Sequence, residues 1–86
     1  MMNTIIIYGT VWCADCITAK SILDTYGIAY EFVNIDGDEE AAEKVMNLNG
    51  GRRVVPTIFI NEVAYTNPSQ MKLIDLIKPF ARSKAS

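Results

Sequence analysis

The chain has 86 residues, half of them hydrophobic, and its ten acidic and eight basic residues give a net charge of −2. This length suits one small domain, no apolar run approaches the roughly 20 residues that cross a membrane, and the charge offers no positive surface for a phosphate backbone. We therefore expect neither a nucleic-acid nor a membrane partner. The chain has no histidine, which excludes Ser-His-Asp and Cys-His catalysis and imidazole zinc sites within one copy.

Short β-rich runs alternate with helical patterns along the whole chain, which predicts a single α/β domain over residues 1–86. In chain order we expect a strand at 5–8, a helix at 13–26, a strand at 30–35, a helix at 38–48, strands at 56–60 and 63–66, and a last helix from about residue 67 that ends or kinks at Pro79. The second helix should turn Ala42, Val45 and Met46 toward the core.

Cap and turn residues mark the boundaries of these elements. Asp38 supplies an acidic N-cap to the second helix. Asn61-Glu62 is typical of a tight turn and predicts that the last two strands form a hairpin. For the last helix we expect Asn67 as the N-cap, Pro68 at the first helical position and Gln70 reaching back to the cap.

Cys13 and Cys16 lie where the first strand gives way to the first helix, and a CxxC in this context indicates redox activity. If Cys13 is the N-cap, its sulfur faces the unpaired backbone N–H groups of Asp15 and Cys16, which favour the thiolate over the thiol. We therefore expect Cys13 to be the nucleophile. Cys16 lies one turn into the helix, is less exposed and should stay a thiol.

Other interpretations of the cysteine pair remain open. A zinc site needs about four ligands, which two cysteines cannot supply, but two inert buried thiols are possible. The flanking loop and Trp12 favour an exposed Cys13. Asp15 suits the helix dipole yet repels a neighbouring thiolate, and Lys20 offsets part of that repulsion. The short loop makes a Cys13–Cys16 disulfide a poor structural staple.

Three segments carry a family resemblance in their order and spacing. They are Trp12-Cys13-Ala14-Asp15-Cys16, Asn49-Gly50-Gly51-Arg52-Arg53-Val54-Val55-Pro56-Thr57 and Thr66-Asn67-Pro68-Ser69. With them the chain resembles the glutaredoxin-like redoxins of the thioredoxin fold, and among their branches the actinobacterial mycoredoxins, which reduce mixed disulfides with mycothiol. The resemblance implies a thioredoxin-like fold in the order β-α-β-α-β-β-α with a four-stranded mixed sheet. Between the cysteines, Ala14-Asp15 differs from the Pro-Tyr of ordinary glutaredoxins and the Gly-Tyr of mycoredoxins.

The resemblance also implies a cis Val55–Pro56 bond beside Cys13. From the sequence alone, a trans proline that opens an edge strand is the ordinary alternative. A cis proline would expose the backbone of Val55, whose N–H and C=O could then pair with a bound thiol as an added strand would. The expected substrate-binding residues are Trp12, Arg53, Val55, Pro56, Thr66 and Asn67.

The start of the last helix bears on which small thiol is used. Glutaredoxins that bind glutathione are expected to place an acidic residue there for its ammonium group, whereas this chain has Thr66, Asn67 and Ser69. Neutral hydrogen-bonding groups favour a sugar-linked thiol such as mycothiol, although simple turn and cap chemistry also explains them. Arg52 and Arg53 could hold the carboxylates of glutathione, so glutathione stays an alternative.

The cysteine motif and the family resemblance together predict a cytoplasmic, monomeric thiol-disulfide oxidoreductase that serves electron transport and cell redox homeostasis. Cys13 would attack mixed disulfides on client proteins, Cys16 would resolve them, and mycothiol or glutathione would supply electrons without a tightly bound cofactor or metal. Alternatives are a redoxin fed by thioredoxin reductase that reduces ribonucleotide reductase, an iron–sulfur carrier in which two copies share a cluster, and a redox-inert interaction module.

Overall fold

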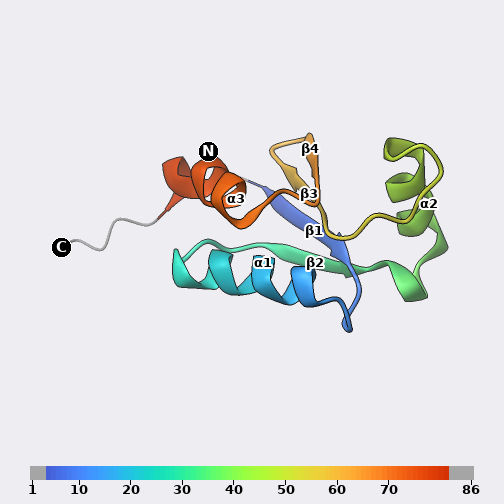
Figure 1. Cartoon of the computed structure of the whole chain (residues 1–86), viewed down its shortest axis with the longest axis horizontal. Coiled ribbons are helices and arrows are strands. Elements are labelled where there is room, and N and C mark those ends of the chain that lie inside the picture. The colour runs from blue at the N-terminus through green and yellow to red at the C-terminus, as the bar shows by residue number, and fades with distance from the viewer. Residues whose placement is uncertain (1–3, 82–86) are drawn as a thin grey trace.

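The computed structural model describes residues 4–81, in which the expected elements appear in the expected order (Figure 1). The structure has β1 (Ile5–Gly9), α1 (Ala14–Thr25), β2 (Glu31–Asn34), α2 (Glu39–Leu48), β3 (Thr57–Ile60), β4 (Val63–Thr66) and α3 (Gln70–Ile77), and in addition two 3-10 helices that were not expected, η1 (Ile35–Gly37) and η2 (Lys78–Phe80). No helix within this described part is long and apolar enough to cross a membrane.

The strands form one mixed sheet in the order β2-β1-β3-β4. β1 runs parallel to β2 and antiparallel to β3, and Ile7 of β1 lies between Phe32 and Ile58 of these neighbours. β3 and β4 form the expected hairpin. The turn between them, Asn61-Glu62, has φ values of 49° and 76°, the double positive φ that a two-residue hairpin of matching twist requires.

Two apolar clusters cover the two faces of this sheet, because successive residues of a strand point to opposite sides. Ile5 and Ile7 of β1 pack with α1 and α3, whereas Tyr8 packs with η1 and α2. Figure 1 shows α1 and α3 together at one end of the molecule and α2 at the other. Only residues 10–13 separate the end of β1 from the start of α1, so the cysteine pair lies at the carboxyl edge of the parallel strands.

The predicted cap of α2 is confirmed and that of α3 is wrong. Asp38 accepts a hydrogen bond from Ala41 N–H, as an N-cap does. The N-cap of α3 is Ser69, whose hydroxyl accepts from Lys72 N–H. Asn67 has a φ of 41°, whereas an N-cap takes an extended backbone. Gln70 is consequently the first residue of the helix and does not reach back to a cap.

Smaller differences concern the ends and the inner face of the elements. The second strand ends at Asn34, because Ile35 already belongs to η1. Of the three residues expected inside α2, Ala42 and Val45 are buried but Met46 is only half-buried, and Ala41 takes the third buried place. At Pro79 the α-helical hydrogen bonding gives way to the 3-10 turn η2, as expected of a proline that removes a donor.

Candidate active site

Cys13 is the N-cap of α1. Its backbone is extended, with φ −84° and ψ 118°, and its Sγ accepts a hydrogen bond from Cys16 N–H at 3.1 Å. This confirms the predicted geometry, in which an amide of the first helical turn points at the sulfur. The expectation of an exposed Cys13 is wrong, because the residue is only 8% exposed. The exposed side chain is that of the preceding residue, Trp12, which is 70% exposed.

Cys16 is fully buried one turn into α1, and both cysteines are free. Burial first, and then the hydrogen bond with Cys13, raise the pKa of the Cys16 thiol to about 12, although the backbone of Thr10 and the ammonium of Lys20 act in the opposite direction. The thiol form expected from the sequence is therefore the stable one at neutral pH. The sulfur packs so closely against β1 that a Cβ at Gly9 would collide with it.

The Val55–Pro56 peptide bond is cis, which confirms the expectation that the family resemblance raised. The carbonyl of Pro56 accepts a hydrogen bond from Asn67 N–H at 2.7 Å, so the loop before α3 is attached to the proline. Within residues 4–81, no main-chain hydrogen bond engages Val55, which precedes β3 and is half-buried. Its N–H and C=O therefore remain available to a ligand.

Thr66 lies close to this region but has a structural partner. Its hydroxyl donates to Asn49 Oδ1 at 2.6 Å, and the amide of Asn49 in turn donates to Val45 C=O at 2.7 Å. The Thr57 hydroxyl donates to Val54 C=O at 2.8 Å. Together with the hydrogen bond that the Asn49 amide donates to the Thr57 hydroxyl at 3.4 Å, they attach the end of α2 to the start of β3 and the end of β4, and so hold the proline segment in place.

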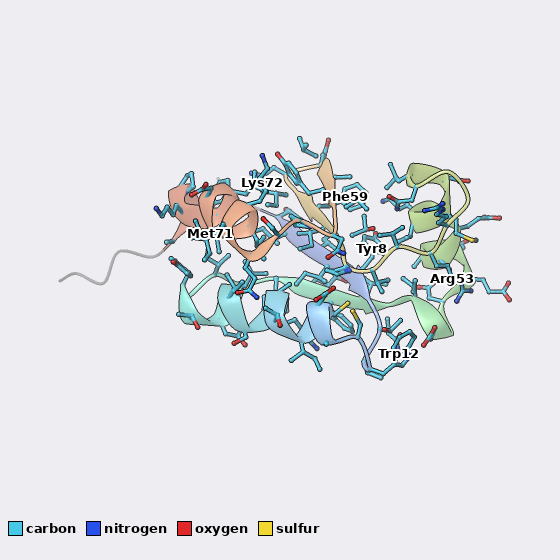
Figure 2. The ribbon with its side chains drawn as sticks, viewed as in Figure 1. Tyr8, Trp12, Arg53, Phe59, Met71 and Lys72 are labelled. Atoms are coloured by element: carbon cyan, nitrogen blue, oxygen red, sulfur yellow. The ribbon has the colours of Figure 1, made fainter. Side chains whose placement is uncertain are left out.

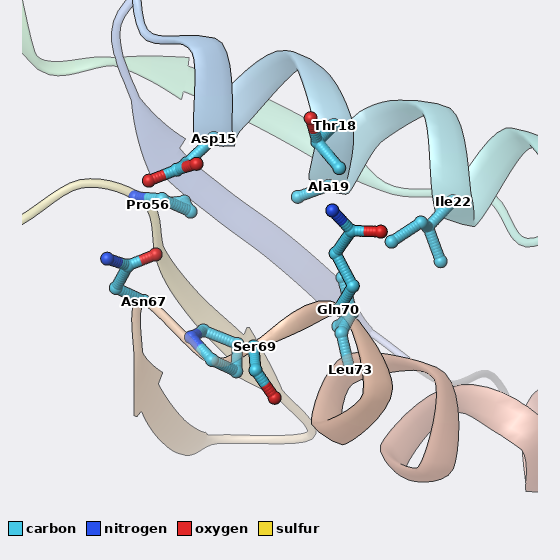
Figure 3. Close-up of a pocket in the computed structure, with 10 residues that line it drawn as sticks. Asp15, Thr18, Ala19, Ile22, Pro56, Asn67, Ser69, Gln70 and Leu73 are labelled. Carbon is cyan, nitrogen blue, oxygen red and sulfur yellow. The ribbon is translucent and has the colours of Figure 1, made fainter.

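A cavity of ≈ 320 Å³ opens between α1 and the start of α3 (Figure 3). It is lined by Asp15, Thr18, Ala19, Ile22, Pro56, Asn67, Pro68, Ser69, Gln70 and Leu73. In Figure 3 the carboxylate of Asp15 lies above Pro56, with the amide of Asn67 on the other side of the proline. The polar lining consists of hydroxyl and amide groups and one carboxylate, with no basic side chain.

A second set of polar contacts involves Trp12, the residue directly before Cys13. The indole Nε1–H of Trp12 donates to Asp36 Oδ2 at 2.9 Å, and Arg53 Nη1 lies 3.6 Å from Asp36 Oδ1. Figure 2 shows Trp12 and Arg53 at the same end of the molecule. Asp36 in η1 thus connects the loop before α1 with the loop before β3.

The structure divides the predicted substrate-binding residues between two places. Pro56 and Asn67 line the cavity, whereas Trp12 and Arg53 meet through Asp36. The sequence interpretation missed Asp36, which was not among the expected site residues. The available signal was position: Asp36 follows β2, whose end pairs with the end of β1, and ligands of α/β sheets bind at the carboxyl ends of parallel strands.

The described residues offer little to a resident metal. Residues 4–81 contain no group of three or more His, Cys, Asp or Glu side chains close enough to hold an ion. Cys13 and Cys16 supply two sulfur atoms, and Lys20, the nearby cation, lies with its Nζ 4.1 Å from the centre of the Phe32 ring. The arrangement fits thiol-disulfide exchange in which the sulfur of Cys13 is the nucleophile and the thiol of Cys16 is the resolving group.

Comparison with known proteins identifies the family. The sequence model of the glutaredoxins matches residues 5–64, which include both cysteines and the cis-proline. The chain belongs to the glutaredoxin family. This glutaredoxin is 37% identical over 81 residues to mycoredoxin 1 of Corynebacterium glutamicum, with 93% of this chain and 100% of the relative covered. It is 45% identical over 64 residues to a Mycobacterium tuberculosis protein named as a glutaredoxin, with 73% of this chain and 76% of the relative covered.

Solved structures agree with this assignment. The glutaredoxin of Archaeoglobus fulgidus superposes with a TM-score of 0.73 at 27% identity, covering 90% of this chain and 88% of its own. The thioredoxin-like fold and the four-stranded mixed sheet predicted from the sequence are therefore confirmed. This glutaredoxin is an enzyme of the thiol-disulfide oxidoreductase type with a cysteine pair in its redox site.

Proposed function

We propose that this glutaredoxin reduces mixed disulfides between client proteins and a low-molecular-weight thiol, with mycothiol as its preferred cosubstrate. The observation that carries the proposal is Cys13 at the N-cap of α1, where its Sγ accepts the Cys16 N–H at 3.1 Å. An amide donor and the positive end of a helix stabilise sulfur as the thiolate, the form that attacks disulfides. With no histidine in the chain, this helix start takes the place of a general base.

The reaction proceeds by two thiol-disulfide exchanges. The Cys13 thiolate forms a disulfide with the sulfur of the small thiol, and the client cysteine leaves as a thiolate and takes up a proton. A second small thiol then attacks that mixed disulfide, so that Cys13 is released and an oxidised small-thiol dimer forms. Cys16 takes part in the reduction of protein disulfides. Its sulfur forms a disulfide with Cys13 and so breaks the bond between Cys13 and the client, which leaves as a thiolate.

The cavity beside the redox site supports the preference for mycothiol. Its polar groups come from side chains such as Asn67, Ser69 and Gln70, and its one charge is the carboxylate of Asp15. Hydroxyl and amide groups suit a sugar-linked thiol, whereas the carboxylates of glutathione would meet a like charge. The similarity to mycoredoxin 1 supports the same choice.

We assign the remaining substrate contacts by position. The free N–H and C=O of Val55 pair with the cysteinyl part of the small thiol beside Pro56, and Asn67 contacts it from the far side of the cavity. Trp12 offers an exposed ring next to Cys13. Arg53 is connected to Trp12 through Asp36, which contacts both side chains. A pair of free thiols of this kind suits a reducing cytoplasm.

The test is a direct comparison of thiol donors. Reduction of a client peptide carrying a mycothiol mixed disulfide is measured with mycothiol, and reduction of the matching glutathione mixed disulfide is measured with glutathione. We expect a higher kcat/KM with mycothiol. Equal or better rates with glutathione would refute the preference, and activity with thioredoxin reductase alone would refute the use of a small thiol. A cluster role predicts visible absorbance after anaerobic purification, which we do not expect.

A further inference from the structure

The two carboxylate oxygens of Asp36 contact two different residues near the redox site. Oδ2 accepts the indole N–H of Trp12 at 2.9 Å, and Oδ1 lies 3.6 Å from Arg53 Nη1. The acid is itself fixed, because its main-chain N–H donates to Asn34 Oδ1 at 3.1 Å. With one oxygen held by the indole, the other stays directed at the guanidinium.

This contact pairs the positive charge of Arg53 with a negative one. It is the one ion pair between side chains in residues 4–81, and its partners Arg53 and Asp36 keep 53% and 41% of their side chains exposed. A ligand can therefore reach the guanidinium, which is the natural partner of a carboxylate. Asp36 offsets that charge, and Asp15 adds a negative charge on the cavity side.

We propose that Asp36 is a specificity-determining residue, which engages Arg53 and so withholds the guanidinium from the carboxylates of an anionic thiol. Trp12 keeps the acid in place for this task. The site is consequently selective for neutral thiols and their disulfides. This inference rests on the proposed function, since it requires that small thiols and their disulfides react at Cys13.

The test uses three symmetrical disulfides that differ in charge: oxidised glutathione, which is anionic, bis(2-hydroxyethyl) disulfide, which is neutral, and cystamine, which is cationic. In each case the Cys13 thiolate bonds to one sulfur, and the other half leaves as a thiolate and takes up a proton. Trp12 is the only tryptophan of the chain and precedes Cys13, so its fluorescence follows the single-turnover reaction.

The decisive variant is Asp36→Asn, which removes the charge but keeps an amide oxygen that can accept from Trp12. At low ionic strength we expect its second-order rate constant with oxidised glutathione to rise about two- to fivefold, the typical effect of an exposed ion pair. The rate should stay the same with the neutral disulfide and fall with cystamine, and added salt should reduce both changes. The matched control is Asp75→Asn, an exposed carboxylate of α3, which should change none of the three rates.

A second comparison shows whether Asp36 acts through Arg53. In an Arg53→Gln background, Asp36→Asn should no longer increase the rate with oxidised glutathione. A gain that persists without Arg53, equal changes with all three disulfides, or no change with any of them would overturn the inference while leaving the proposed function intact. A wild-type protein that reacted with none of the three disulfides would overturn both.

Discussion

Cys13 and Cys16 have the same side chain and lie in one helical turn, yet their surroundings are opposite. Cys13 stands at the start of α1 with a main-chain N–H directed at its sulfur. Cys16 is fully buried against Gly9 of β1, and its pKa is raised to about 12. The difference arises from helix position: the N-cap faces unpaired donors, whereas a residue one turn later faces the sheet. Cys13 is placed to act as the nucleophile, and Cys16 stays a protonated thiol in the reduced protein.

The largest expected effect separates the chemical role of Cys13 from its structural one. Cys13→Ser should reduce mixed-disulfide reduction to the level of a blank, because a hydroxyl does not form the nucleophilic anion at neutral pH. Serine is a good N-cap, so the free energy of unfolding should stay within about 0.5 kcal/mol of the wild type.

Cys13→Ala is the matched control for this change, since it also removes the cap and should lower the free energy of unfolding by about 1 kcal/mol. Urea titration and the mixed-disulfide assay together measure both roles. Residual turnover in Cys13→Ser would place the nucleophile elsewhere.

Cys16→Ser should divide the two activities. Reduction of mixed disulfides with a small thiol needs only Cys13 and should remain, whereas reduction of protein disulfides should be lost, because no second sulfur can expel the bound client. Insulin disulfide reduction and the mixed-disulfide assay on the same preparation provide the comparison. Loss of both activities would contradict the separate roles of the two cysteines.

The raised pKa of Cys16 predicts two pH dependences. Closure of the Cys13–Cys16 disulfide needs the Cys16 thiolate, so its rate should rise about tenfold per pH unit as long as the pH lies below the raised pKa of that thiol. The reduced unfolded chain loses the Cys16 proton first, near the ordinary pKa of 9.0, so the free energy of unfolding should decline as the pH rises from 9.0 toward about 12.

Quenched-flow mass spectrometry measures the closure rate, and urea titrations of the reduced protein measure the stability. Cys16→Ser should lack this contribution to the decline in stability. A closure rate that is level with pH would show that another group accepts the proton.

The last prediction concerns stability rather than activity, and tests the packing that buries Cys16. Gly9→Ala introduces a Cβ that collides with the Cys16 sulfur and approaches Phe32 Cε1 to 3.3 Å. Overpacking of this kind should lower the free energy of unfolding by about 1–3 kcal/mol. The control is Gly37→Ala, where a Cβ meets no atom within 4 Å and stability should change little. Equal urea midpoints for the two variants would show that Cys16 is not closely held.

Most elements could be predicted from local patterns, and the errors have local causes too. Asn67 looked like the cap of α3 because Pro68 follows it, yet a left-handed φ of 41° makes it a turn residue and leaves Ser69 as the cap. Cys13 looked exposed because a loop with Trp12 flanks it, but the sulfur turns toward the first turn of α1. In both places the sequence suggested the correct residue types and the backbone decided which of them acts.

The site was harder to predict because its parts come from separate segments. Thr66 was expected at the substrate, but its hydroxyl donates to Asn49, 17 residues away in sequence. Asp15 was weighed only as a charge next to a thiolate, and the structure places it in the lining of the cavity. Neither outcome follows from spacing, because each depends on which loops the sheet order brings together.

The sequence by itself determined the α/β alternation, the cysteine at a helix start and the second cysteine buried one turn later. These features depend on neighbours within a few residues and on the period of the apolar pattern. Only the tertiary structure decided the cavity between α1 and α3 and the contact of Trp12 with Asp36, which are 24 residues apart. Such contacts exist because the sheet places the ends of β1 and β2 side by side, and chain spacing alone does not specify that neighbourhood.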